Sequence, residues 1–146
     1  MAFGDYIRHQ AHVTGWLKKN ERGLSNEQLV DLLELALSSL WESAALSVGE
    51  VTLAAVLDRT VVNACEMYKW LPNIVVSGGA ADFSVLREAA PRLNRRNVLR
   101  AVHFILTDFQ AILGNLTAET ITPALNRQLA NARFKKARRA NRGKLQ

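Results

Sequence analysis

One stretch decides the fold: Ser25-Asn-Glu-Gln-Leu-Val-Asp-Leu-Leu-Glu-Leu-Ala-Leu-Ser-Ser-Leu-Trp-Glu-Ser-Ala-Ala-Leu46. Its first four residues form a capping box, in which the Ser25 hydroxyl accepts from the amide three residues on and the Gln28 side chain returns to the serine amide. Leu24 and Leu29 occupy the positions of a hydrophobic staple around this box. The sequence therefore predicts a helix that begins at Ser25 and runs to about Leu46.

The apolar surface of this helix is unusually broad. Leucine and tryptophan surround most of its circumference, which exceeds the single apolar stripe of an ordinary surface helix. We therefore expect the helix to be central in a bundle or covered by another subunit. The polar residues are confined to one stripe, which consists of Glu27, Asp31, Glu34, Ser38 and Glu42.

A second capping box, Ser47-Val48-Gly49-Glu50, predicts another largely apolar helix that runs to about Leu71. Pro72 ends it, because proline disfavours helical geometry in the residue before it. The two long helices are then either antiparallel neighbours or sharply bent at Gly49.

The remaining pattern is also mainly helical. It predicts a short helix in the first twenty residues with Asp5 as N-cap, a short helix over 83–90, a third long helix over about 95–113, and a last helix from Pro123 to about Arg138. One long helix kinked at Pro123 is the alternative for the last two. A β-branched run before Ser77-Gly78-Gly79 is compatible with a small β-hairpin at 73–84. The predicted fold class is an all-α helical bundle.

Composition favours one cytoplasmic domain. A chain of 146 residues with 49% hydrophobic content fits a single core, and we expect a helical domain over 1–132 followed by a basic tail over 133–146. The single cysteine, Cys65, suits a reducing compartment and is expected to be a packing residue on a buried helix. No apolar stretch reaches the length of a membrane span.

Charge divides the chain. Residues 25–91 carry nine carboxylates against three cations, whereas the last 55 residues carry twelve cations against Asp108 and Glu119. Seven cations crowd into the final run and are the predicted contacts to nucleic acid or another polyanion: Arg133, Lys135, Lys136, Arg138, Arg139, Arg142 and Lys144. The competing uses are a solubilising tail, attachment to an anionic membrane surface, and pairing with the acidic middle of the same or a neighbouring subunit.

Other candidate sites are sparse. Asp5, His9 and His12 share a helical face and are weak metal candidates, although a second element would have to complete the ligand set. His103 lies on the polar side of its helix and is expected to be a surface or interface residue rather than a general base. Asp58 and Arg59 predict an interhelical ion pair that sets register or, alternatively, a small-molecule site. We predict no catalytic residue and no cofactor.

These observations favour a non-catalytic interaction or regulatory module that acts as a homodimeric scaffold, because closed symmetric association would cover the broad apolar helices. The alternative is a nucleic-acid-associated protein that grips phosphate through the basic tail. A third hypothesis is a metal or small-ligand sensor or enzyme.

Overall fold

The computed structural model describes residues 3–77 and 80–133, and it confirms the all-α bundle with one small hairpin. The described residues form these elements in chain order: α1 (Phe3–Asn20), α2 (Asn26–Val48), α3 (Glu50–Met67), β1 (Val75–Ser77), β2 (Ala80–Asp82), α4 (Ser84–Ala89), a short 3-10 turn (Ala90–Arg92), α5 (Arg95–Leu116) and α6 (Thr122–Asn131).

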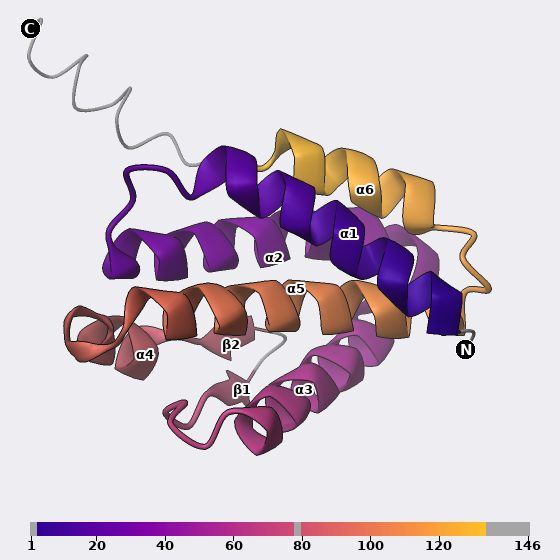
Figure 1. Ribbon diagram of the computed structural model, residues 1–146. Helices are drawn as coiled ribbons and strands as arrows, with labels where there is room; N and C mark the ends of the chain where they lie inside the picture. The colour runs from indigo at the N-terminus through magenta and orange to yellow at the C-terminus, as the bar shows by residue number, and fades with distance from the viewer. Residues whose placement is uncertain (1–2, 78–79, 134–146) are drawn as a thin grey trace, which may run out of the picture.

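The elements are arranged in three layers (Figure 1). Helices α2 and α5 form the middle. Helix α1 packs on α5 and α6 packs on α2, so these two helices cover one side of the middle pair. Helix α3, the hairpin and α4 cover the other side. None of the helices in the described ranges is both long and apolar enough to cross a membrane.

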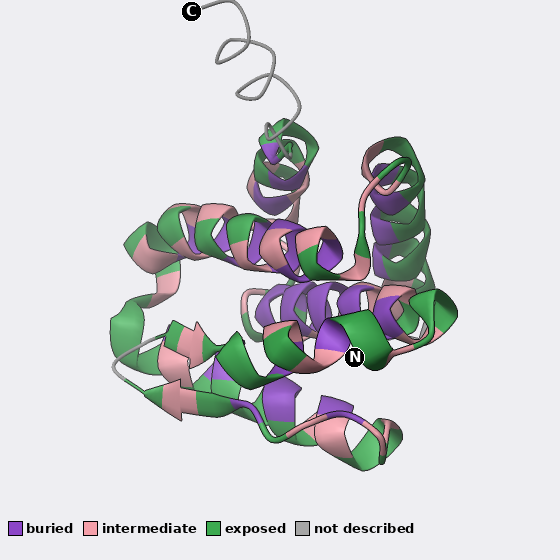
Figure 2. Ribbon diagram, turned by 90° about the vertical axis from the view of Figure 1, so that its left-hand side faces the viewer, coloured by how far each residue is buried: buried purple, intermediate pink, exposed green. Residues whose placement is uncertain are grey.

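Helix α2 is central within its own chain. It contacts α3, α4, α5 and α6, and Figure 2 shows the buried positions of the helices facing the interior of the bundle. The predicted capping box is present, since the Ser25 Oγ accepts from the Gln28 amide (3.1 Å) and the Gln28 side chain accepts from the Ser25 amide (2.9 Å). Its broad apolar surface is therefore explained by burial against four neighbouring helices, which a single chain supplies.

The second predicted capping box was wrong. Gly49 is the N-cap of α3, with φ of 82° and no side-chain hydrogen bond to the helix. This left-handed conformation is readily adopted by glycine, and it bends the chain so that α3 crosses α5 as well as packing on α2. The bent alternative is the correct one.

Helix α3 ends at Met67, earlier than the predicted Leu71. Tyr68 is extended, and its ring packs edge-on against Phe104 of α5, with 5.8 Å between ring centroids, and near Trp70 at 5.7 Å. Aromatic packing on α5 therefore replaces the last helical turn, an outcome that depends on a residue 36 positions away in the sequence.

The last two helices are separate. Asn94 caps α5 through its side chain, which accepts from the Arg96 amide, and a turn over 117–121 leads into α6. Pro123 lies in the first turn of α6, as predicted, although the helix begins one residue earlier, at Thr122, with Ile121 as its N-cap. The helix ends at Asn131, short of the predicted Arg138, because Ala132 is extended.

Candidate functional site

A groove runs between α1 and α6, formed by two adjoining cavities that share Ala11 and His12. The first cavity has a volume of about 460 Å³ and the second about 510 Å³. The first is lined by Arg8, His9, Ala11, His12, Glu119, Thr122 and Asn126. The second is lined by Ala11, His12, Gly15, Trp16, Lys19, Asn20, Ala130 and Arg133.

A histidine and a carboxylate close one end of the groove. His9 is only 3% exposed, and its Nε2 donates to Glu119 Oε1 at 3.0 Å. The Thr122 hydroxyl donates to the same oxygen at 2.8 Å. Because carboxylate oxygens only accept, the Nε2 atom of His9 must carry the proton. The contact ties α1 to the turn that precedes α6.

The backbone around Glu119 is built to present this side chain. Ala118 and Glu119 both take left-handed conformations, with φ of 51° and 63°, which L-residues other than glycine adopt at a cost. The Glu119 amide donates to the Gly114 carbonyl at 2.7 Å. A Cβ atom on Gly114 would lie 2.4 Å from Glu119 Oε2, so glycine leaves the space that the carboxylate fills.

A second long-range contact closes the other end. The Trp16 indole Nε1 donates to the carbonyl of Ala132 at 2.9 Å, and both residues are buried. Lys19 and Arg133 line the cavity beside this contact. Arg133 is exposed, and the basic run of the sequence continues directly from it.

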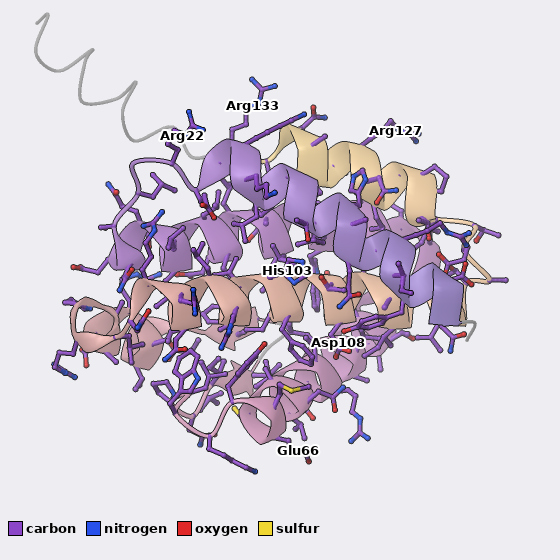
Figure 3. All side chains as sticks on the ribbon, viewed as in Figure 1. Arg22, Glu66, His103, Asp108, Arg127 and Arg133 are labelled. Carbon is purple, nitrogen blue, oxygen red and sulfur yellow. The ribbon has the colours of Figure 1, made fainter. Side chains whose placement is uncertain are left out.

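The layer of α1 and α6 is rich in exposed cations. Two of its three carboxylates are engaged, since Asp5 pairs with Arg8 and Glu119 binds His9; the third is Glu21. Figure 3 shows Arg22, Arg127 and Arg133 along the outer edge of this layer. The exposed cations of the described segments 3–24 and 117–133 are Arg8, Lys18, Lys19, Arg22, Arg127 and Arg133.

The predicted metal face does not come together as a ligand set. Asp5 pairs with Arg8, His9 turns inward to Glu119, and His12 lines the groove. Within residues 3–77 and 80–133, no three His, Cys, Asp or Glu side chains are grouped so that they could hold a metal ion.

His103 has a structural partner on α1. The Thr14 hydroxyl donates to the Gln10 carbonyl at 2.8 Å, so its oxygen accepts from His103 Nε2, also at 2.8 Å. Helix α1 thus covers part of the polar side of α5: His103 is half-buried there, whereas Arg96 and Arg100 remain exposed. Farther along, the side chains of Thr107 and Gln110 are buried, and they find no hydrogen-bond partner among the described residues.

The acid that bonds between α3 and α5 is Asp108 and not the predicted Asp58. Asp58 and Arg59 are exposed, so Asp58 needs no buried partner. Instead, Asn63 of α3 donates to Asp108 Oδ2 of α5 at 2.9 Å. Burial raises the pKa of Asp108, against the opposing effects of the Asn63 hydrogen bond, the Arg59 charge and Thr60. Burial, followed by the nearby Asp108 charge, also raises the pKa of Tyr6.

The remaining candidates add little to the groove. Cys65 is a free, half-buried thiol, and Ser77 ends β1. Of the predicted polyanion contacts, only Arg133 belongs to the described residues. The others lie outside them: Lys135, Lys136, Arg138, Arg139, Arg142 and Lys144.

Comparisons of the chain with protein-family models, with curated proteins and with solved structures found no match. The site must therefore be interpreted from its own chemistry. Lysine, arginine, histidine and asparagine side chains line the groove, and these are donors that suit phosphate oxygens. Sequence reasoning missed the groove because its cations are spread over α1 and α6, and it missed Glu119 as the partner of His9 because 110 residues separate them.

Proposed function

We propose that this protein is a nucleic-acid-associated binding module whose phosphate-contacting surface is the α1–α6 groove together with the basic residues that follow Arg133. The observation that carries the proposal is the placement of Arg133. It lines the same cavity as Lys19 and His12, so the cationic run of the sequence begins at one end of a groove that already carries cations.

Electrostatic attraction supports a polyanion rather than a small neutral ligand. Contacts to phosphate require positive charge but no exact spacing, and they gain free energy by releasing counterions. The groove is long relative to one phosphate, since its two cavities adjoin through Ala11 and His12. Its aromatic residue, Trp16, is buried and bound to Ala132, which favours backbone contact over base stacking.

The proposal assigns binding, without a catalytic role, to the groove. His9 Nε2 and Glu119 Oε1 are already engaged with each other, and Thr122 adds a second donor to that oxygen. These bonds hold the carboxylate in a structural contact between α1 and the start of α6. We also propose a cytoplasmic location, on the basis of a single free thiol at Cys65.

The test compares two double charge reversals in the full chain. Lys19→Glu/Arg133→Glu places acids in the groove, whereas Arg59→Glu/Lys69→Glu makes the same charge change at exposed positions on and just after α3. Affinity for a fluorescent oligonucleotide is measured by anisotropy between roughly 50 and 200 mM salt. The groove variant should bind at least about tenfold more weakly, and its log–log salt slope should fall by about 2.

The control separates a specific surface from net charge. If the α3 variant loses as much affinity as the groove variant, the effect comes from overall charge and the groove has no special role. Unchanged binding by the groove variant would remove the proposal.

A homodimeric scaffold is the second candidate, and one observation favours it. Leu46 and Val51 are 94% and 87% exposed, and Ala55 and Val62 are also exposed along α3, on either side of the charged Asp58. An exposed apolar stripe can mark a contact between protein surfaces. Light scattering should then show a dimer at micromolar concentration that Val51→Lys dissociates, and a monomeric parent protein would exclude this candidate.

A further inference from the structure

The polar stripe of α2, which consists of Glu27, Asp31, Glu34, Ser38 and Glu42, carries four carboxylates and is called the acidic stripe below. A guanidinium group already occupies part of it. Arg87 of α4 donates through Nε to Asp31 Oδ1 at 2.8 Å and forms a second ion pair with Glu34. The next polar positions, one and two turns farther along α2, are Ser38 and Glu42. Among the described residues, Glu42 forms no ion pair.

A cavity of about 300 Å³ opens beside this second half of the stripe. Glu34, Ser38 and Glu42 line its polar side. Its apolar side comes from three elements that the fold brings together: α2, α3 and the end of the hairpin. The apolar lining residues are Leu37, Trp41, Leu57, Ala80, Ala81 and Phe83.

This combination selects one ligand chemistry. A carboxylate at the rim favours a cation, and an apolar, aromatic-containing wall favours an attached hydrocarbon or ring. Arg87 shows that the same stripe accepts a guanidinium. The cavity therefore suits a cationic peptide segment that carries at least one large apolar side chain.

We propose that the occupant is the C-terminal segment of the same chain, residues 134–146. It contains six lysines and arginines, no carboxylate side chain, and two large apolar residues, Phe134 and Leu145. Its charge is complementary to the acidic stripe, and Leu145, near its end, matches the apolar wall of the cavity.

The end of the segment can reach most of the surface of the domain. Thirteen residues span at most about 45 Å when extended, whereas a compact domain with a radius of gyration of about 15 Å is about 38 Å across. The cavity lies on the α3 and hairpin side of α2, opposite α6, so the segment would have to pass around the bundle. A tethered segment reaches an effective concentration in the millimolar range, which favours its own cavity over that of another molecule.

This inference goes beyond the proposed function and supplies a form of regulation for it. The acidic cavity and a nucleic acid would compete for the same cations, so the cavity acts as an internal competitor. Weakening the docking should therefore strengthen nucleic-acid binding, because the segment no longer has to leave the cavity.

The first test uses the ¹⁵N-labelled full chain at low salt, without nucleic acid. Three tryptophans report on three places: Trp41 in the acidic cavity, Trp16 in the α1–α6 groove and Trp70 near the end of α3. Reversing two charges in the segment, with Arg138→Glu/Arg139→Glu, should shift the indole N–H resonance of Trp41 and leave the other two in place. Arg22→Glu/Arg127→Glu, which reverses two exposed charges beside the α1–α6 groove, is the matched control and should leave Trp41 unmoved.

Other occupants give different results. A shift of Trp16 in place of Trp41 would mean that the segment lies along the groove, and a Trp41 shift that depends on protein concentration would mean that a second copy supplies it. Either result, or an unmoved Trp41, overturns the proposal.

A second test exchanges the charges. Added salt should move the Trp41 resonance of the parent chain, because it screens the docking contact, and it should no longer do so in Glu42→Lys. Combining Glu42→Lys with Arg138→Glu/Arg139→Glu should restore the salt response of Trp41. The control is Glu66→Lys alone, on α3 away from the cavity, which should show the same salt response of Trp41 as the parent chain. No restoration by the combined variant would mean that Glu42 and these arginines do not interact. Because no nucleic acid is present, this outcome is independent of the groove proposal.

Discussion

The layer of α1 and α6 and the layer of α3, the hairpin and α4 flank the same central helices, but their long-range polar contacts differ in burial. His9 and Trp16 of α1, which bind the residues on either side of α6, are only 3% and 6% exposed. In the second layer, the side chains of the ion pair between Arg87 and Asp31 are 35% and 42% exposed. The polar contacts of the first layer are therefore better shielded from water than this ion pair.

This difference predicts where single substitutions should matter. Polar contacts that are shielded from water leave an unsatisfied group when one partner is removed. Exposed ion pairs leave a group that water can solvate.

His9→Ala should destabilise the protein most. It leaves the Glu119 carboxylate without its histidine donor, and the Oε2 atom of that carboxylate already has no hydrogen-bond partner within the described part of the chain. The expected loss is about 2 to 4 kcal/mol in the free energy of unfolding, measured by urea denaturation. His12→Ala is the control, because His12 lines the same cavity but is exposed, and it should change stability by less than about 0.5 kcal/mol. Equal effects would show that the His9–Glu119 contact does not hold α1.

Two glycine-to-alanine substitutions should change the stability of the protein in opposite directions. In Gly114→Ala the new methyl group meets the Glu119 carboxylate, so we expect a loss of about 1 to 3 kcal/mol. In Gly15→Ala, inside α1, nothing lies within 4 Å of the new atom, so we expect a gain of about 0.5 to 1 kcal/mol from the lower entropy of the unfolded chain. Thermal melts of both variants test the pair. A stable Gly114→Ala protein would mean that the turn over 117–121 can move freely.

Arg87→Ala should have a smaller effect, although it removes two ion pairs. Arg87, Asp31 and Glu34 are all partly exposed, so water replaces much of the lost attraction, and the expected loss is below about 1 kcal/mol. The effect should also shrink as salt is added. A loss as large as that of His9→Ala would mean that the layer of α3, the hairpin and α4 depends on this exposed ion-pair cluster as strongly as the layer of α1 and α6 does on its buried contacts.

Asp108→Asn should raise the stability of the protein slightly, by an amount that depends on pH. Burial raises the pKa of Asp108 above that of the unfolded chain, so ionisation opposes folding, and the parent protein loses stability as the pH rises through the ordinary carboxyl range. The asparagine variant has no such loss and can still accept from Asn63. Its melting temperature should therefore exceed that of the parent at neutral pH, and the difference should shrink towards pH 3. A difference that is constant with pH would exclude this cause.

Much of the fold followed from local patterns. The capping box at Ser25, the start of the third long helix at Arg95, the proline in the first turn of α6 and the paired strands of the hairpin are confirmed at or within a residue or two of their predicted places. The wrong capping box at Gly49 is a local error, whereas two helix ends were misplaced where a distant residue intervenes. Phe104 packs against Tyr68 where α3 ends early, and Trp16 binds the Ala132 carbonyl just after α6 ends.

The candidate site was less accessible to prediction. The sequence identified Arg133 and the histidines of the first helix, but it assigned Asp5, His9 and His12 to one ligand face. Helical spacing places these residues near one another but does not specify which of them turns inward. It also left open whether the apolar surface of α2 is covered by its own chain, a question that the packing of α5 and α6 answers.

The sequence by itself determined the helices, the apolar content of α2 and α3, and the separation of acidic and basic charge along the chain, because each depends on neighbours within a few turns. Only the tertiary structure decided that α1 and α6 form a basic groove, that His9 meets Glu119, and that Trp41, Glu42 and Phe83 line one cavity. These juxtapositions join residues tens of positions apart, and their geometry is set by how the helices pack, which spacing along a single helix does not encode.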